Sequence, residues 1–332
     1  MATTTAAPPN QIIWNLANTV CATRALYSIA AVGVADHLDD EPLTPEALGQ
    51  SCDVNADALG RIIDLLSTYG IFAVSEHGIS HTDASRLLRT DHPQSMRAFA
   101  RLNGLPGLWR SLGAMDHSLR TGAPGWQIVD ARGFFAYLQE HPDEGAVFEE
   151  AMTAKARFDI GSIITAYDFK PYQTIIDVAG GRGHLLQAVL ETAPDARGVL
   201  FELPDVANTV TVENGRLRVQ SGDFFTDPLP HGDLYMLMEI IHDWADAECI
   251  RILQGVRAAA DRGASLIVIE DIAPDDGIDW RSQTMDVLML NVTGGRQRSG
   301  RQHADLLRQA GFRCTRVVET SGPMRIVEAV AV

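Results

Sequence analysis

The chain has 332 residues, 46% of them hydrophobic, which is enough for about two globular domains with cores of their own. Its formal net charge of −16 argues against nucleic acid and anionic membranes as partners, because both attract basic surfaces. The four cysteines lie far apart without a CxxC pair, which favours reduced thiols and a cytoplasmic chain over a disulfide framework or a metal site.

The N-terminal end is expected to carry no structure of its own. Residues 1–10 are rich in Thr, Ala and Pro without a charged leader, so we predict a disordered tail there and no targeting signal. No later apolar run reaches the roughly 18 residues that a membrane span needs.

Residues 11–105 are predicted to form a helical domain that contains a winged-helix module. Apolar residues recur at helical spacing over 11–38, with faces wide enough to favour a partner chain. Two capped helices follow, beginning near Thr44 and Asn55, and then a short hairpin over 71–81. The second helix carries Asp57 and Asp64 against Arg61 alone, so a dimerising module is favoured over DNA binding.

Residues 106–168 are predicted to be helices that link two domains and contribute to a substrate pocket. The segment is interrupted at the glycine- and proline-rich stretch 121–125. It holds many of the aromatic residues, which either form core or line a pocket for a flat apolar ligand.

Residues 169–332 alternate between strand and helix patterns, which predicts a doubly wound parallel sheet with its ligand at the carboxyl ends of the strands. Seven strands are expected, at 174–178, 198–201, 217–220, 234–238, 266–270, 313–318 and 325–332.

The stretch Asp177–Gly183 is the most informative motif. It joins a β-branched run to an apolar helical pattern, so backbone N–H groups and a helix N-terminus would meet a ligand there. Glu202 follows at roughly the 20-residue offset of a carboxylate that binds ribose hydroxyls. A dinucleotide enzyme usually carries this fingerprint near the start of its binding domain. Here a long helical segment precedes it, which favours a methyltransferase.

Polar residues mark the predicted strand ends: Asp177, Glu202, Asp223, His242, Asp243 and Glu270. Each alone is explained equally well as a helix cap or turn residue, but the whole set on one edge of a sheet indicates a site. His242 is the side chain best suited to take a proton near neutral pH, and neighbouring carboxylates can fix its tautomer.

Five motifs in order resemble those of the caffeic-acid-type, S-adenosylmethionine (SAM)-dependent O-methyltransferases. They correspond to the family's DVGGGxG, FDLP, GDMF, HDWSDE-C and MD…GGKER, at Asp177–Gly183, Phe201–Pro204, Gly222–Phe225, His242–Cys249 and Met285–Arg298. The similarity spans nearly the whole chain. It implies a Rossmann-like α/β domain of seven strands whose last hairpin is antiparallel, over residues 169–332, and a helical N-terminal domain that forms a homodimer.

The resemblance also implies the roles of individual residues. Gly181 and Gly183 would hold the methionine part of SAM, Glu202 the ribose, and Asp223 with Phe224 the adenine. Further cofactor contacts are expected at Asp177, Ala179, Leu203, Phe225, Met238 and Trp244. His242 would be the general base with Asp243 beside it, and Glu270 would orient its ring. The expected substrate contacts are Phe148, Met152, Met289 and Gln297.

The activity that follows is methylation of a phenolic or enolic hydroxyl of an aromatic or polyketide-like secondary metabolite, with S-adenosylhomocysteine (SAH) as product and without a metal. The alternative is a relative that keeps SAM as a structural element and catalyses hydroxylation, decarboxylation or cyclisation. A third class, a winged-helix regulator that senses a ligand, is disfavoured by the acidic helix and the complete cofactor set.

Three positions depart from the family pattern. Ala179 replaces the first glycine, which is tolerable where that residue keeps a negative φ. Met238 stands where plant members have a lysine near the adenine. Gln297 replaces a second carboxylate beside the histidine and, as a neutral amide, stabilises an imidazolium less. Weaker base catalysis or a more acidic substrate is therefore expected.

Overall fold

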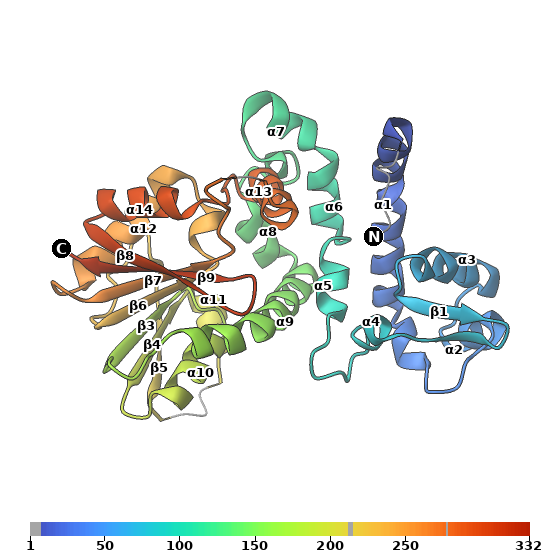
Figure 1. Ribbon diagram of the computed structural model, residues 1–332, viewed down its shortest axis with the longest axis horizontal. Helices are drawn as coiled ribbons and strands as arrows, with labels where there is room; N and C mark the ends of the chain where they lie inside the picture. The colour runs from blue at the N-terminus through green and yellow to red at the C-terminus, as the bar shows by residue number, and fades with distance from the viewer. Residues whose placement is uncertain (1–7, 212–214, 277) are drawn as a thin grey trace, which may run out of the picture. The chain divides into compact units, whose positions relative to one another are not determined.

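The computed structural model describes residues 8–211, 215–276 and 278–332 (Figure 1). Internal contacts divide the chain into two compact units, Met1–Trp109 with Leu138–Lys155, and Arg110–Tyr137 with Ala156–Val332. Most of the predicted tail, residues 1–7, lies outside the described residues. Pro9 and Asn10 already belong to the first helix, because proline is readily accommodated in a first helical turn.

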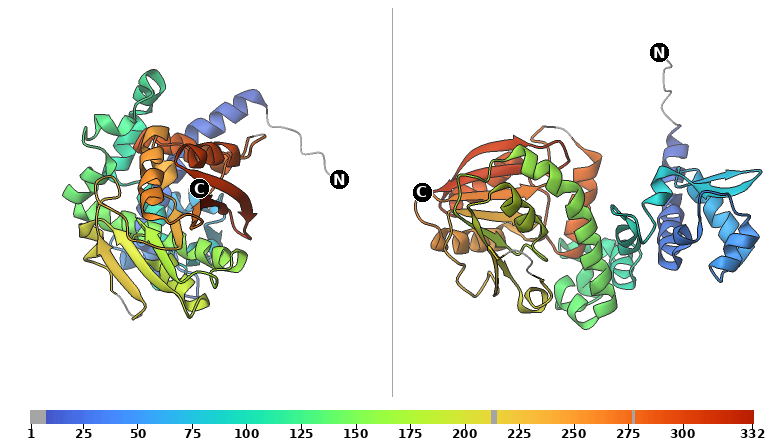
Figure 2. Two further views of the ribbon diagram at one scale, coloured as in Figure 1. Left: turned by 90° about the vertical axis from the view of Figure 1, so that its left-hand side faces the viewer. Right: turned by 90° about the horizontal axis from the view of Figure 1, so that it is seen from below.

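The first unit is mainly helical. Its elements are α1 (Pro9–Val32), η1 (Val34–His37), α2 (Pro45–Ser51), α3 (Ala56–Ser67), β1 (Phe72–Ser75), β2 (Gly78–His81), α4 (Asp83–Arg86), α5 (Arg97–Leu102), the start of α6 (Pro106–Gly113) and the first part of α9 (Pro142–Ala166). The predicted caps are present, since the Thr44 and Asn55 side chains accept hydrogen bonds from backbone N–H groups of α2 and α3. The antiparallel β1–β2 hairpin beside α2 and α3 completes the predicted winged-helix arrangement (Figure 2).

The second unit is built on a seven-stranded sheet. Its strands are β3 (Thr174–Val178), β4 (Arg197–Glu202), β5 (Leu217–Ser221), β6 (Leu234–Met238), β7 (Ser265–Glu270), β8 (Phe312–Glu319) and β9 (Arg325–Ala331). They lie in the order β5-β4-β3-β6-β7-β9-β8, parallel except that β9 runs antiparallel to both of its neighbours. Every predicted strand is present, with bounds within one residue, and the antiparallel last hairpin is confirmed.

Helices cover both faces of this sheet. α12 (Asp246–Ala259) and α14 (Gly300–Gln309) pack on one face, and α10 (His184–Thr192) with the end of α9 (Pro142–Ala166) packs on the other (Figure 1). The residues of β6 from Leu234 to Leu237 are fully buried because they face protein on both sides, as expected for a central parallel strand.

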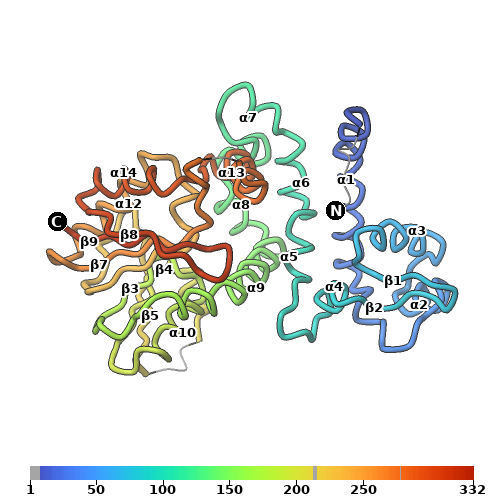
Figure 3. The backbone as a smooth tube through the Cα atoms, in the orientation of Figure 1, coloured from blue at the N-terminus to red at the C-terminus, as the bar shows by residue number. Residues whose placement is uncertain are grey.

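α13 (Trp280–Val292) lies beside α7 (Met115–Thr121) (Figure 3) and also contacts η2 (Gly125–Ile128). η2 is followed by α8 (Phe134–Glu140), and the short α11 (Pro204–Ala207) and η3 (Ile241–Asp243) follow β4 and β6. Trp126 is buried, with the rings of Phe134 and Tyr137 edge-on at 4.8 and 5.3 Å, so these three rings are core, whereas Phe135 and Phe158 are exposed. Within the described ranges, no helix is long and apolar enough to cross a membrane.

Candidate active site

The strand order places the predicted polar residues along one edge of the sheet. β3 lies between β4 and β6, so the order in which successive strands are added to the sheet reverses between β3 and β6. Doubly wound sheets bind their ligands at such a switch point. Asp177, Glu202 and Glu270 stand at or next to the carboxyl ends of their strands. Asp223 follows β5 by two residues, and His242 lies in η3, just after β6. The structure therefore places the whole set at one edge.

The turn after β3 depends on its glycines. Gly181 and Gly183 have φ values of 59° and 75°, which favour glycine. A Cβ on Gly180 would lie 2.2 Å from the Asp177 carboxylate, so no side chain fits there. Ala179 has a φ of 56°, so the condition under which alanine would be tolerated here, a negative φ, is not met. The turn needs a left-handed residue at the end of β3, where the Ala179 N–H already bonds the carbonyl of Phe201.

Asp177 is a buried carboxylate without a strong partner. It is fully buried, and apart from a weak approach of the Leu186 N–H neither oxygen is hydrogen-bonded among the described residues. Burial, and second the nearby Glu202 carboxylate, raise the pKa of Asp177 to about 7. A group of this kind is expected to meet a polar partner that comes from outside the chain.

Glu202 closes the turn from the neighbouring strand. Its Oε2 accepts from the Gly181 N–H at 2.8 Å and its Oε1 from the Leu203 N–H at 2.7 Å. The carboxylate is buried but stands at the open end of β4. SAM is the cofactor that the family resemblance implies. The Asp177 carboxylate is complementary to its ammonium group and the Glu202 carboxylate to its ribose hydroxyls, so the residues present fit that cofactor.

Aromatic rings gather in the loops after β5 and β6. The Trp244 ring lies edge-on to Phe225 at 4.8 Å and to Phe224 at 6.0 Å, and stacks with Phe135 at 6.4 Å. Asp223 shapes the loop that carries two of these rings, because its Oδ1 accepts from the Phe225 N–H at 2.8 Å. The loops after β5 and β6 thus share an aromatic wall. Phe135 belongs to this wall although spacing alone did not single it out.

His242 is held at the same edge, with only 7% of its surface exposed. Its Nδ1 is buried without a hydrogen-bond partner among the described residues, and its Nε2 lies 3.8 Å from Oδ1 of Asp243. The backbone N–H of His242 donates to Glu270 Oε1 at 2.9 Å. The prediction that Glu270 orients the imidazole needs correction: its carboxylate fixes the backbone of η3.

Two residues that sequence reasoning missed hold this part of the site. The buried guanidinium of Arg298 donates to the carbonyls of Ile241 and Trp244, on both sides of His242, at 2.9 and 2.8 Å. It also donates to Asp246 at 2.7 Å. His303 of α14 contacts Glu270 at 3.1 Å. Arg298 ends the matched GGKER-like motif, which was the available signal; His303 lies outside every motif.

The remaining predicted residues fall into two groups. Met238, at the end of β6, is half-buried, while Met289 on α13 and Gln297 are buried, and neither amide atom of Gln297 has a partner among the described residues. Phe148 and Met152 lie on the part of α9 that belongs to the first unit, so their place in a pocket stays a prediction. In the described part of the chain, no group of three or more His, Cys, Asp or Glu could hold a metal.

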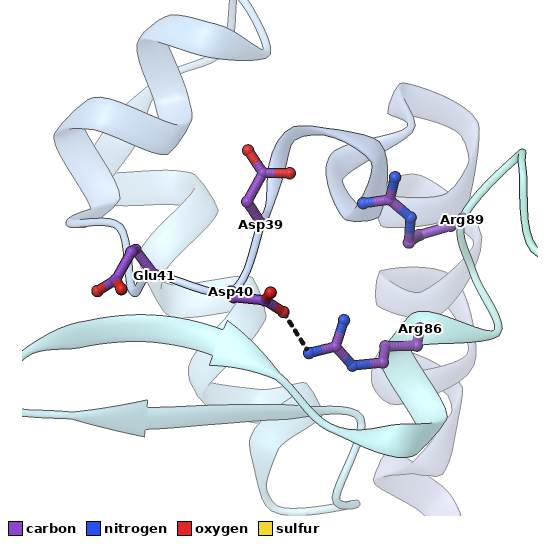
Figure 4. A pocket seen from close by; sticks show the side chains of 5 residues that line it. All are labelled: Asp39, Asp40, Glu41, Arg86 and Arg89. Atoms are coloured by element: carbon purple, nitrogen blue, oxygen red, sulfur yellow. Dashed lines mark hydrogen bonds and ion pairs between the residues drawn. The ribbon is translucent and has the colours of Figure 1, made fainter.

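A separate surface hollow lies in the first unit, lined by Asp39, Asp40, Glu41, Arg86 and Arg89 (Figure 4). Arg86 pairs with Asp40 at 3.1 Å, and Arg89 pairs with Asp91 at 2.9 Å. Its arginines are thus paired with carboxylates of the chain itself, and nothing in the hollow calls for a ligand.

The comparisons with known proteins agree with this geometry. Residues 109–313 match the model of the O-methyltransferase domain, and residues 14–91 that of the O-methyltransferase dimerisation domain. The chain is 32% identical to the phenazine O-methyltransferase PhzM of Lysobacter antibioticus, over 98% of this chain and 97% of that protein.

Solved structures extend the similarity. CalO1, a methyltransferase in calicheamicin biosynthesis in its SAH-bound form, matches with a TM-score of 0.87 and 30% identity, over 98% of this chain and 100% of that one. NcsB1, an O-methyltransferase from neocarzinostatin biosynthesis in complex with SAM and 2-hydroxy-5-methyl naphthoic acid, matches with a TM-score of 0.79 and 29% identity, over 94% and 96%.

This chain belongs to the O-methyltransferase family. Its membership confirms the predicted family, fold class and enzyme class, and the solved neighbours hold the cofactor, SAM or its product, that the sequence predicts.

Proposed function

We propose that this enzyme methylates a phenolic or enolic hydroxyl of an aromatic small molecule, with SAM as the methyl donor and His242 as the general base. The observation that carries the proposal is the buried imidazole of His242, with one ring nitrogen unpartnered, on the sheet edge that also carries Asp177 and Glu202.

Base catalysis follows from the chemistry of the acceptor. A phenol has a pKa near 10, so its oxygen is a much stronger nucleophile once the proton has been removed. His242 takes that proton, and the carboxylates of Asp243 and Glu270 stabilise the imidazolium that forms. The buried turn that holds His242 keeps water from competing for it.

The turn after β3 would hold the cofactor. Asp177 would bind the ammonium group of the methionine part and Glu202 the ribose hydroxyls, while Asp223 and Phe224 would border the adenine. When bound, SAM supplies a methyl group activated by a sulfonium charge. The turn is rigid because Glu202 already ties Gly181 in place.

In the aromatic wall, Phe224, Phe225 and Trp244 would border the adenine of the cofactor, a flat ring of the kind that stacked and edge-on contacts select. Phe135, which stacks with Trp244, would add a contact for an aromatic substrate. Met289 would add a flexible apolar contact. Gln297, buried with both amide atoms unpartnered, would bond either the substrate or the ring of His242.

A mass-shift screen tests the activity. Hydroxylated aromatic metabolites are incubated with isotope-labelled SAM and the wild-type enzyme, and the label is expected in the product as a methyl ether. His242→Ala should lower turnover by about 10²- to 10⁴-fold with SAM affinity unchanged by calorimetry. His231→Ala, an exposed histidine of the same unit, is the control.

Two outcomes would contradict the proposal. Equal turnover of the His242→Ala enzyme would remove the base. A product that is hydroxylated, decarboxylated or cyclised without label would point to the alternative reaction of the family.

The homodimer is proposed to form through α1. The helix exposes a row of large apolar residues, which a monomer would leave in water: Ile12, Ile13, Trp14, Leu16 and Val20. Leu16, 76% exposed, is the most open of them. Leu16→Lys should therefore sediment as a monomer, while Leu119→Lys on α7, where leucine is 85% exposed, should stay dimeric. A Leu16→Lys dimer of unchanged affinity would exclude this interface.

The net charge of −16 supports a chain without a nucleic-acid partner, and its four free cysteines support a cytoplasmic location. Retention of duplex DNA by the purified protein at physiological salt would oppose the first of these.

A further inference from the structure

Glu270 makes two contacts that together account for both of its oxygens. Oε1 accepts from the backbone N–H of His242 at 2.9 Å, and Oε2 lies 3.1 Å from Nε2 of His303. Glu270 is fully buried and His303 is 1% exposed. An ionised carboxylate is costly at such a position without a charged partner.

The second ring nitrogen of His303 shows how many protons the ring needs when Glu270 is ionised. Nδ1 of His303 lies 3.0 Å from the carbonyl oxygen of Ser299, which can only accept. A neutral imidazole has one N–H, so it can satisfy either the carbonyl or an ionised Glu270, not both. Beside an ionised Glu270, both contacts are hydrogen bonds only when the ring carries two protons; a neutral ring would need Glu270 to be the donor, as a carboxylic acid. The geometry therefore fits an imidazolium of His303 against a carboxylate of Glu270.

The surroundings of Glu270 agree with this assignment. Burial acts to raise the pKa of Glu270, yet the pKa stays below its ordinary value, because the hydrogen bond from His303 and the charges of His242 and His303 outweigh burial. The charge of Glu270 also acts on Cys249 of α12: after burial, it is among the causes that raise the pKa of that thiol. Arg325, its register partner on β9, turns its guanidinium to Glu319 and to the Ile272 carbonyl.

We propose that His303 is a positioning residue for the methyl transfer: its imidazolium keeps Glu270 ionised and fixed against the amide of His242, so that the base stays in place and keeps a negative charge nearby. The inference rests on the proposed function of His242. It assigns to α14 a part in the site that no motif predicts, in a chain where Gln297 replaces the second carboxylate.

The first test needs no activity. Two-dimensional ¹H–¹⁵N spectra of the imidazoles in the ligand-free protein report which ring nitrogens are protonated, and His303→Gln identifies the signal. At pH 7 both nitrogens of His303 should be protonated, and Glu270→Gln should convert the ring to a neutral tautomer. A neutral His303 in the wild-type protein at pH 7 would overturn the proposal whether or not the enzyme transfers methyl groups.

The second test is the pH dependence of kcat at saturating SAM. His303→Phe keeps the ring volume and removes the donor, so the pKa of Glu270 rises and Glu270 takes up a proton at a pH where the wild type is ionised. The acid limb of the profile should move to higher pH by about one to two units, the equivalent of one charge-assisted hydrogen bond. His303→Gln, which keeps an N–H donor, should restore part of the shift.

Two controls separate positioning from a general loss of structure. His81→Phe removes another histidine whose two ring nitrogens both contact oxygens, in the first unit, and should leave the profile unmoved. SAM affinity should be unchanged in His303→Phe. A lower kcat with an unshifted acid limb in His303→Phe would mean that His303 only packs. An inactive wild type with a doubly protonated His303 would instead mean that the proposed function is wrong.

Discussion

Asp177→Asn should stabilise the ligand-free enzyme while weakening its hold on the cofactor. The carboxylate is fully buried, and its pKa is raised from 3.8 to about 7 by burial and then by Glu202. An acid with a raised pKa binds its proton more tightly in the folded than in the unfolded chain. The free energy of unfolding therefore falls as the pH rises from about 3.8 to about 7, and is flat above.

The size of the effect follows from these values. The shift of about 3.2 units corresponds to about 4 kcal/mol in total, at about 1.4 kcal/mol for each unit. Between pH 5 and pH 8, the stability of the wild type changes only up to the pKa of about 7, which is about two pH units. Because asparagine does not titrate, the stability of Asp177→Asn relative to the wild type should grow by about 3 kcal/mol over that range.

Urea denaturation of the ligand-free proteins at pH 5 and pH 8 measures this difference, and calorimetry with SAM measures the loss of affinity. Asp195→Asn, an exposed aspartate of the same unit, is the control and should follow the wild type at both pH values. A stability difference that stays constant between pH 5 and pH 8 would show that Asp177 does not titrate in this range, although its burial requires it to. Unchanged SAM affinity would show that the carboxylate does not face the cofactor.

Two further substitutions test the backbone of the site. Ala179→Gly should raise the free energy of unfolding by roughly 0.5–1 kcal/mol, because it relieves left-handed strain of about 1–2 kcal/mol and the entropy of glycine offsets part of that gain. Thermal unfolding measures the change, and a lower melting temperature would show that the turn is not strained. Arg298→Met should lower the free energy of unfolding by about 2 kcal/mol or more and also lower kcat, because two carbonyls around His242 and the Asp246 carboxylate lose their donor. Arg296→Met, at an exposed neighbouring position, is the control. Equal urea midpoints for the two variants would contradict this role of Arg298.

The sheet and its polar edge could be predicted because they depend on local patterns. Each strand is a continuous apolar run that ends in a polar residue, as in Leu234–Met238 before His242, and parallel pairing then brings the strand ends to one edge. The succession of strands along the chain was therefore sufficient to predict that these polar residues share one edge of the sheet. The wide apolar face of α1 could be predicted in the same way, from its spacing alone.

The contacts between elements could not be predicted from local patterns. Whether Glu270 meets the ring or the backbone of His242 depends on the curvature of η3, which Arg298 sets from more than 50 residues away in sequence. His303 looks like any polar residue in the first turn of a helix until α14 is packed on the sheet. The sign of φ at Ala179 depends on how the turn closes on Phe201.

The two halves of the site handle buried charge in opposite ways, and each way suits its task. At the cofactor turn, Asp177 has no strong partner, so the free energy lost by burying it is recovered only when a cation binds, which couples stability to the ligand. At the base, Glu270 and Arg298 have all their partners within the chain, so the backbone that carries His242 is in place before any ligand arrives. Among the described residues there, the imidazole of His242 and the amide of Gln297 keep unpartnered atoms. SAM should therefore raise the melting temperature strongly in the wild type and much less in Asp177→Asn.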